Sequence, residues 1–261
     1  MTGRPPEGSA SELAAAPPIV ADIVGDRTPL LERYAAILAT RGLDHGLVGP
    51  REVPRLWERH IVNCALLGEI IPQGAHVIDV GSGAGLPGLV LAVARPDLRV
   101  DLVEPLERRV RWLDAAVAEL GLGGSVGVHR GKAQAFWGEL TADLVTARAV
   151  ARLADLTRWC LPLVPVGGAL LAMKGESAAR ELEEDRNAVE GVGGRDPELV
   201  TIGAGRVDVP TRVIRVTRGE RPEGFEVRQP RSARPTGSAL AGRERRGSGR
   251  RAGRRGGRTR G

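Results

Sequence analysis

Apolar and polar positions follow two different periods along this chain, and the change falls within its first third. Up to that point apolar residues recur every three or four positions, which is the spacing of amphipathic helices. The pattern predicts a helical segment over 19–40, interrupted at Asp26–Pro29, and a second over 51–71 after a loop at 41–50. Pro54 falls in the first turn of the second segment, where a missing N–H is tolerated.

The rest of the pattern is an alternation of short apolar runs with amphipathic stretches. The apolar runs predict five strands, at 76–80, 99–104, 125–129, 142–147 and 167–173. The stretches between and after them predict helices at 87–95, 106–120, 152–161 and 177–190. Two further strands, at 198–203 and 212–217, can form an antiparallel pair at the edge. This order of elements predicts an α/β fold with a doubly wound, mainly parallel sheet.

The two ends of the chain follow neither period. Residues 1–18 are rich in Pro, Ala, Gly and Ser, and from Arg218 onward Arg, Gly, Ser and Pro dominate. Such segments bury too little apolar surface to offset the entropy of ordering, so both are predicted to be disordered. The predicted organisation is a disordered N-terminus (1–18), a helical segment (19–73), an α/β domain (74–217) and a disordered Arg/Gly-rich tail (218–261).

Charge is distributed unevenly along this organisation. The whole chain has a net charge of +6 and a sequence pI near 10.4, which suggests nucleic acid as a partner. Residues 218–261 hold fourteen arginines against four glutamates, so the remaining 217 residues carry a net charge of −4. The basic signal therefore belongs to the tail. The tail is either a solubilising extension or an arm that raises RNA affinity without selecting a sequence.

Composition narrows the remaining classes of protein. Apolar residues make up 42% and aromatic residues 3% of the chain, so Leu, Val and Ala must fill the core. Cys64 and Cys160 lie far apart without a CxxC partner or a histidine cluster, which argues against a disulfide framework and a metal site. The sequence shows neither a signal peptide nor an apolar window of membrane-spanning length, so a cytoplasmic protein is expected.

The stretch Asp79–Gly85, with the sequence Asp-Val-Gly-Ser-Gly-Ala-Gly, is the most informative part of the chain. Its glycines allow positive φ angles and a close approach of a ligand to the backbone, and the next helix directs its free N–H groups to the same place. A dinucleotide fingerprint counted from Gly81 requires Gly or Ala where this chain has Leu86. Glu104 ends the next strand, where a carboxylate can accept hydrogen bonds from ribose hydroxyls. A nucleotide-like cofactor is therefore predicted, bound by Asp79, Gly81, Gly83, Gly85 and Glu104.

Several motifs beyond this loop occur in a particular order. They are Trp57-x-Arg-His-Ile61, Val77–Gly88, Arg108–Leu113, Ala147–Ala149 and Met173–Gly175. From about Tyr34 to Val216 the series resembles the ribosomal RNA small subunit methyltransferase G family, also called glucose-inhibited division protein B. The resemblance implies a class I S-adenosylmethionine-dependent methyltransferase fold with an N-terminal helical extension. It also implies methylation of N7 of guanosine 527 in 16S rRNA of the 30S subunit.

The same resemblance assigns residues to the site. It implies cofactor contacts at Gly81, Leu86, Ala133, Gln134 and Arg148, with the ribose hydroxyls on Glu104. The family usually has Glu at Gln134, and an amide there can still bond the adenine edge. Arg148 and Lys174 end two strands at the edge where ligands bind, and are the candidate catalytic residues. RNA contacts are expected at Arg59, His60, Lys132 and Arg212. Lys132, Asn63, Cys64 and 45–48 depart from the family pattern.

Methylation at guanine N7 requires no proton transfer by the protein. Guanine N7 carries an in-plane lone pair and no proton, so it needs no general base, and catalysis would depend on positioning. The strand end Val145–Arg148 lacks the motifs typical of exocyclic amine, pyrimidine carbon or ribose methylation. Two alternatives stay open, a small-molecule methyltransferase on the same fold and a non-catalytic RNA-binding or ribosome-assembly factor. A monomer is expected.

Overall fold

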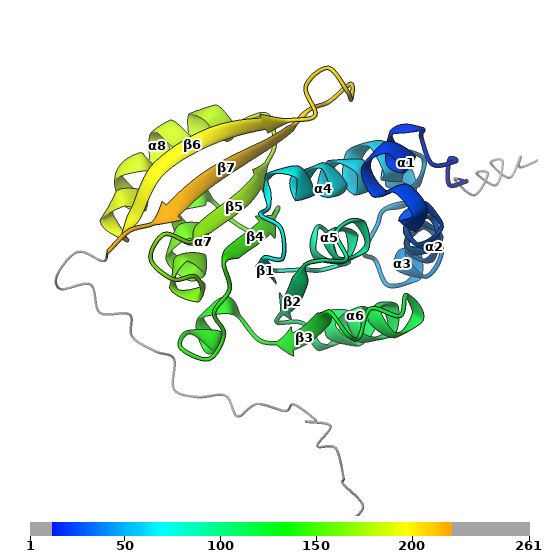
Figure 1. The fold of residues 1–261 in the computed structure, drawn as a ribbon, viewed down its shortest axis with the longest axis horizontal. Helices are drawn as coiled ribbons and strands as arrows, with labels where there is room; N and C mark the ends of the chain where they lie inside the picture. Colours follow the sequence, from blue (N-terminus) through cyan, green and yellow to red (C-terminus); the bar gives the residue numbers. More distant parts are fainter. Residues whose placement is uncertain (1–11, 221–261) are drawn as a thin grey trace, which may run out of the picture.

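The computed structural model of the protein describes residues 12–220 (Figure 1). The first eleven residues of the predicted disordered N-terminus and the predicted tail beyond residue 220 lie outside this range. Contacts with the folded part begin earlier than the predicted start at Ile19. Leu13 and Ala16 pack against the hydrophobic core, and Nε1 of Trp57 donates a hydrogen bond to the carbonyl of Ala14 (2.8 Å).

A sheet of seven strands in the order β3-β2-β1-β4-β5-β7-β6 lies at the centre of the described residues. The strands are β1 (His76–Val80), β2 (Arg99–Glu104), β3 (Val126–Arg130), β4 (Leu144–Arg148), β5 (Ala169–Lys174), β6 (Gly194–Ile202) and β7 (Thr211–Arg218). The first five are parallel, whereas β7 is antiparallel to both β5 and β6. The predicted doubly wound α/β fold is confirmed, including the antiparallel pair at its edge.

Helices cover both faces of this sheet. The helices are α5 (Gly88–Ala94) and α6 (Glu107–Glu119) on one face, and α7 (Leu153–Cys160) and α8 (Ala178–Gly191) on the other. Side chains along β1 alternate between two buried clusters, with Val77 in the cluster that contains α5 and Ile78 and Val80 in the cluster that contains α7. Strands covered on both faces are apolar on both sides, which is why these segments read as continuous apolar runs.

Strand β6 differs from the prediction, because it begins at Gly194 and not at Glu198. The pairing with β7 shifts its register between Arg195 and Glu198, and Asp196 there has a φ of 47°. These are the features of a β-bulge, and Pro197 lies within it. Proline has no N–H for a ladder, but β6 is an edge strand, where this is tolerated. The pattern failed at this point because Asp and Pro are rare in strands.

The N-terminal helical segment is more divided than its pattern predicts. It contains α1 (Ile19–Val24), α2 (Thr28–Ala39), α3 (Arg41–Asp44), the 3-10 turn η2 (Pro50–Arg55), the π-helical turn η3 (Trp57–Ile61) and α4 (Val62–Leu67). The predicted break before α2 is confirmed, whereas the predicted loop at 41–50 includes α3. The stretch 51–71 is mostly helical, but it changes between 3-10, π and α geometry. Pro54 cannot donate to a preceding carbonyl, and π turns are frequent at functional sites.

The order of strands places a crevice at the carboxyl ends of β1 and β4. These two strands are neighbours, but the chain leaves β1 toward one face of the sheet and β4 toward the other. Such a switch point is where open α/β sheets bind their ligands. The loop after β1 and the loop after β4 therefore border the same space. None of the helices within residues 12–220 has the combined length and hydrophobicity needed to span a bilayer.

Candidate functional site

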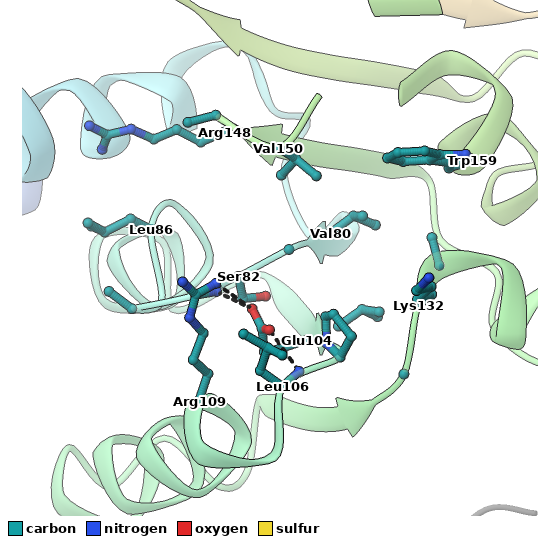
Figure 2. Close-up of a pocket in the computed structure, with 18 of the residues that line it drawn as sticks. Val80, Ser82, Leu86, Glu104, Leu106, Arg109, Lys132, Arg148, Val150 and Trp159 are labelled. Atoms are coloured by element: carbon teal, nitrogen blue, oxygen red, sulfur yellow. Dashed lines mark hydrogen bonds and ion pairs between the residues drawn. The ribbon is translucent and has the colours of Figure 1, made fainter. Parts of the chain in front are cut away.

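A pocket of about 670 Å³ opens at this switch point (Figure 2). Four segments of the α/β domain form its walls: the glycine loop after β1, the turn from β2 into α6, the turn after β3 and the loop after β4. The N-terminal helical segment contributes Leu47 and His60. The pocket therefore joins segments that the sequence separates by about a hundred residues, at the place that the topology predicts.

The glycine loop has a backbone that only glycine adopts readily. Gly81, Gly83 and Gly85 have φ angles of 73°, 55° and 101°. A Cβ on Gly81 would lie 2.7 Å from Cγ2 of Val150, and a Cβ on Gly85 would lie 2.4 Å from Cδ1 of Leu89. Gly81 and Gly83 line the pocket, and their predicted contact with the cofactor stays a prediction. Gly85 does not line it, and instead allows the loop to pack closely on the start of α5.

The carboxylate of Glu104 fixes the floor of the pocket. Its Oε2 accepts a hydrogen bond from the N–H of Gly83 (3.0 Å), and its Oε1 accepts one from the N–H of Leu106 (2.9 Å). Arg109 lies 3.7 Å from Oε2, and Figure 2 shows these contacts. Each carboxylate oxygen has two acceptor sites, so Glu104 can accept further hydrogen bonds from hydroxyl groups in the pocket. The geometry therefore leaves room for the predicted ribose contact, which stays a prediction.

Asp79 lies beneath the loop and does not line the pocket, so the structure gives its predicted contact with the cofactor no direct support. Its buried Oδ2 accepts a hydrogen bond from the N–H of Gly88 (3.0 Å), the first residue of α5. The hydroxyl of Ser82 donates to the carbonyl of Asp79 (2.8 Å). A carboxylate at a helix N-terminus satisfies one of the free N–H groups there. Asp79 and Gly85 are thus residues that shape the loop from behind.

Burial raises the pKa of Asp79 to about 7, against the hydrogen bond from the N–H of Gly88 that lowers it. The folded protein therefore holds a proton that the unfolded chain releases between about pH 4 and about pH 7. The free energy of unfolding should fall across this range by up to roughly 4 kcal/mol, because here the unfolded state binds fewer protons. Asp79→Asn keeps an acceptor for Gly88 but cannot titrate, so its unfolding free energy should fall less. Urea unfolding at pH values from about 5 to about 8 measures both slopes, and equal slopes would contradict the raised pKa.

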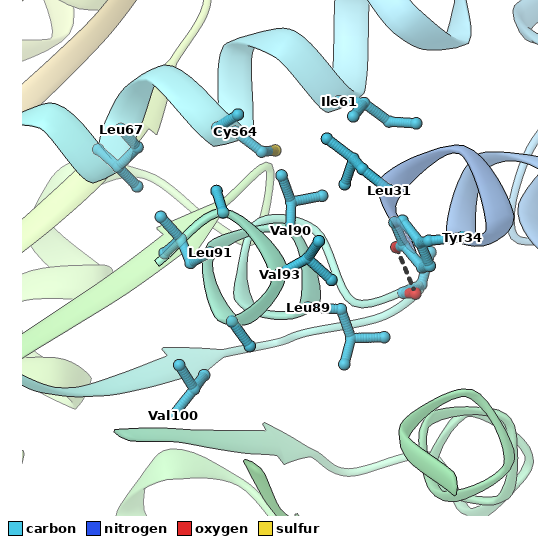
Figure 3. Close-up of a cluster of buried hydrophobic side chains, with 14 of the residues drawn as sticks. Leu31, Tyr34, Ile61, Cys64, Leu67, Leu89, Val90, Leu91, Val93 and Val100 are labelled. Atoms are coloured by element: carbon cyan, nitrogen blue, oxygen red, sulfur yellow. Dashed lines mark hydrogen bonds between the residues drawn. The ribbon is translucent and has the colours of Figure 1, made fainter. Parts of the chain in front are cut away.

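Two side chains from distant elements hold the carbonyl of Ala84, which lines the pocket. The hydroxyl of Tyr34 in α2 donates to this oxygen (3.0 Å), and Nε1 of Trp112 in α6 donates to it as well (3.0 Å). Figure 3 shows Tyr34 among apolar side chains between the N-terminal helices and α5, with its hydrogen bond dashed. Both lone pairs of the Ala84 carbonyl are used. We call this arrangement the Ala84 clamp.

One feature of the sequence indicates the Ala84 clamp, although the pattern of apolar positions does not. Tyr34 is the chain's one tyrosine, and it occupies a buried position of an amphipathic helix. A buried tyrosine hydroxyl usually has a hydrogen-bond partner, so a long-range contact could be expected. The partner itself could not be inferred from sequence, because Ala84 is fifty residues away.

Arg148 is directed from β4 toward the N-terminal helical segment (Figure 2). Its guanidinium donates to the carbonyl of Arg59 (3.0 Å) and to Sγ of Cys64 (3.2 Å), and it contacts Nδ1 of His60. A guanidinium only donates, so Nδ1 of His60 accepts, and Nε2 donates to Glu52 (3.0 Å). Burial and the neighbouring Arg148 lower the pKa of His60 and favour this neutral form. Arg148 lines the pocket, but its donors join β4 to η3.

Lys174 lies outside the pocket lining, which argues against its predicted catalytic role. Its Nζ donates to the carbonyl of Ala151 (2.8 Å) and to Oε1 of Glu181 (2.7 Å), and its side chain is 9% exposed. The strand-end rule placed this residue correctly at the edge of β5. It could not show that the side chain points to the face that α8 covers.

The other predicted residues divide between the pocket and the surface. Those that line the pocket are Leu86, Ala133, Gln134, His60 and Lys132. Arg59 is exposed on η3, and Arg212 is half-buried on β7 beside Lys174, so neither belongs to the lining. The lining residues that were not predicted from sequence as contacts are Leu47, Val80, Ser82, Ala84, Val103, Pro105, Leu106, Arg109, Gly131, Ala149, Val150 and Trp159. Leu106 and Val150 each follow a strand end by two residues, which is the one local signal they carry.

Within residues 12–220, neither cysteine belongs to the pocket lining. Cys64 and Cys160 are both buried and unbridged. Residues 12–220 contain no group of three or more His, Cys, Asp or Glu side chains arranged to hold a metal ion.

A mainly parallel sheet with a glycine loop after its first strand and a carboxylate at the end of its second is typical of a class I methyltransferase fold. A solved structure, the mitomycin 7-O-methyltransferase MmcR, shares this fold with a TM-score of 0.51 at 16% identity. The match covers 73% of this chain and 60% of that one.

Sequence comparison gives the family within this class. The chain belongs to the rRNA small subunit methyltransferase G family, whose sequence profile matches residues 27–207. It is 54% identical over 202 residues to ribosomal RNA small subunit methyltransferase G of Salinispora tropica, covering 75% of this chain and 84% of the relative. It is 53% identical over 196 residues to the protein of the same name in Thermobifida fusca, covering 75% and 82%. The resemblance inferred from the motifs is confirmed.

Proposed function

We propose that this protein transfers a methyl group from S-adenosylmethionine to N7 of guanosine 527 in 16S rRNA of the 30S subunit. The observation that carries the proposal is the assembly of the family's motif blocks around one pocket. The glycine loop, the end of β2, the turn after β3 and the end of β4 all line it. Relatives that carry the name of a small-subunit rRNA methyltransferase support the substrate.

The residues of the pocket fit this cofactor. Glu104 retains acceptor sites for ribose hydroxyls. Leu106 follows β2 and Gln134 follows the neighbouring strand β3, so they can serve the face and the edge of an adenine. A Cβ on Gly83 would meet no atom closer than 3.7 Å, so the space in front of the loop is open to a ligand. When bound, S-adenosylmethionine would supply a methyl group on a sulfonium sulfur, which the N7 lone pair accepts without loss of a proton.

The protonation states of the pocket support an acceptor that needs no base. Nδ1 of His60 accepts from Arg148, and Nε2 donates to Glu52, so neither ring nitrogen is free to take a proton. Glu104 holds the N–H groups of Gly83 and Leu106, and its remaining acceptor sites are the ones proposed for the ribose hydroxyls. These groups orient and hold their neighbours, and catalysis would depend on positioning.

The remaining parts of the proposal concern the partner. Lys132 at the pocket, Arg59 on η3 and Arg212 on β7 would contact phosphates of the RNA, and these contacts would position it without reading its sequence. We expect the protein to act as a monomer in the cytoplasm, where small subunits are assembled.

Methyl transfer to rRNA tests this proposal. We expect 7-methylguanosine at position 527 after incubation of the protein and labelled S-adenosylmethionine with 30S subunits or 16S rRNA from cells that lack the protein. Cofactor binding without transfer to either RNA substrate would favour a small-molecule methyltransferase. Absence of cofactor binding by calorimetry would favour an RNA-binding or assembly factor.

The Ala84 clamp gives a prediction about cofactor affinity. Tyr34→Phe removes one donor and leaves the ring in place, so the loop loses one of two external restraints. We expect the dissociation constant for S-adenosylmethionine to rise roughly threefold to tenfold. Trp57→Phe is the matched control, since it removes an N–H donor to Ala14 in the same helical segment and not a donor to Ala84. Calorimetry should separate the two variants, and an equal effect of both would make the clamp merely structural.

A further inference from the structure

The loop after β4 has properties that the cofactor site does not explain. We propose that Val150 is a specificity-determining residue that forms the apolar wall against which the plane of the acceptor purine lies. Lys174 is the positioning residue that holds the loop carrying Val150. The inference deepens the proposed function and rests on it.

Backbone strain marks this loop. Ala149 has a φ of 54°. Among residues 12–220, one other non-glycine residue, Asp196, has a positive φ. A residue with a Cβ adopts this region only where its surroundings impose it, and such residues concentrate at functional sites. The turn at Ala149 brings Val150 over the end of β1, where Cγ2 of Val150 lies 2.7 Å from the position that a Cβ of Gly81 would occupy.

The side chain of Val150 is exposed within the pocket. It is 36% exposed, and it is one of four exposed large hydrophobic residues in the described range, with Leu106, Val166 and Val209. Of these, Leu106 and Val150 line the pocket, and Figure 2 shows them on opposite sides of it. Burying such apolar surface under a flat ligand is favourable. Two apolar side chains on opposite sides of the pocket can each contact one planar group. One group would be the adenine of S-adenosylmethionine and the other the purine that accepts the methyl group.

The chemistry of the two ends of the pocket decides which group each contact receives. Leu106 is the residue whose N–H donates to Glu104, so it belongs to the end that suits an adenosine. Val150 lies at the β4 end of the pocket, two residues after Arg148. The guanidinium of Arg148 contacts His60, and both ring nitrogens of His60 are engaged. That end offers shape and apolar surface to an incoming base. A valine contacts the face of a base by dispersion alone, without hydrogen bonds. It would therefore favour a planar ring whose plane lies in contact with the valine side chain.

Contacts from β5 and α8 hold this loop in place. Lys174 donates to the carbonyl of Ala151 (2.8 Å) and to Glu181 (2.7 Å), and Glu181 also accepts from the N–H of Leu153 (2.6 Å). Asp185 accepts from the N–H of Ala154 (3.0 Å). The buried ammonium of Lys174 thus has a role without touching a ligand. It compensates the strain at Ala149 by anchoring the next residues.

Methylation kinetics test the role of Val150. We expect Val150→Ala to lower kcat/KM for 30S subunits or 16S rRNA about tenfold, which is the effect of lost apolar contact in a recognition pocket. Val150→Thr, which keeps the shape but replaces one methyl group with a hydroxyl, should lower it similarly. Cofactor affinity by calorimetry should change less than about twofold. Val166→Ala is the matched control, since Val166 is 60% exposed and lies outside the pocket lining.

Single and double variants test whether Lys174 acts through Val150. Lys174→Met should lower kcat/KM for the RNA, Lys174→Arg should recover part of it, and cofactor affinity should stay unchanged. In the double variant with Val150→Ala the losses should be less than multiplicative, because both act on one contact. If the wild type is active and Val150→Ala is equally active, the inference about Val150 is overturned and the proposed function stands. Fully multiplicative losses in the double variant would have the same consequence. A wild type that binds the cofactor but transfers no methyl to RNA would overturn the proposed function with it.

Discussion

Gly83→Arg is expected to abolish binding of S-adenosylmethionine. Gly83 has a φ of 55°, and the nearest atoms to a Cβ there would be the carbonyl of Gly81 at 3.7 Å and a guanidinium nitrogen of Arg109 at 4.0 Å. The new side chain would therefore enter the open pocket and not the protein core. It would strain the backbone, fill the space in front of the loop and add a second guanidinium beside Arg109. We expect the dissociation constant to rise by about a hundredfold or more in calorimetry.

The chain provides a matched control for this variant. Gly74 also has a positive φ, 69°, with no atom within 4 Å of a Cβ position, but it lies before β1 and outside the pocket lining. Gly74→Arg imposes the same backbone strain and the same added charge, so its cofactor affinity should match that of the wild type. Retained affinity in Gly83→Arg would show that the cofactor binds elsewhere.

Glu104→Gln should be nearly as damaging, although it changes only one atom of the side chain. The two carboxylate oxygens accept from the N–H groups of Gly83 and Leu106. An amide has a single acceptor oxygen, so its NH₂ group would face one of these two donors. The loop or the turn into α6 would have to move, and the charge that favours ribose hydroxyls would be lost. We expect cofactor affinity to fall about a hundredfold and methyl transfer with it.

Glu107→Gln is the control for the loss of charge. Glu107 lies in the first turn of α6, is exposed, and pairs with Arg111 and Arg130 at the surface. Exposed pairs of this kind contribute little. Cofactor affinity and methylation should therefore stay at wild-type values. If Glu104→Gln behaves like Glu107→Gln, the carboxylate does not hold the cofactor.

The elements and the site loop could be predicted because their causes are local. Alternation of apolar runs and amphipathic stretches depends on neighbouring positions, and it correctly predicts the strands and the four helices of the α/β domain. The spacing of Gly81, Gly83 and Gly85 likewise reflects the conformation of one turn. Where a local rule is broken for a tertiary reason the prediction fails, as at Pro197, which is tolerated because β6 is an edge strand.

The roles of single side chains could be predicted less well. Asp79 and Lys174 both lie at or near strand ends, and a rule about strand ends treats them as ligand contacts. Asp79 instead bonds Gly88 beneath the loop, and Lys174 bonds Ala151 and Glu181. A position at an edge does not determine the direction of a side chain, which depends on the elements packed against that face.

By itself, the sequence determined the fold class, the family and the glycine loop, because these depend on residue types at short spacings and on the order of motifs. Only the tertiary structure decided how that loop is held. The carbonyl of Ala84 accepts from Tyr34 and Trp112, which come from two separate helices. It also decided that Arg148 joins β4 to the N-terminal helical segment and that Val150 borders Gly81. Such contacts join residues many tens of positions apart, and no local pattern records which of them will meet.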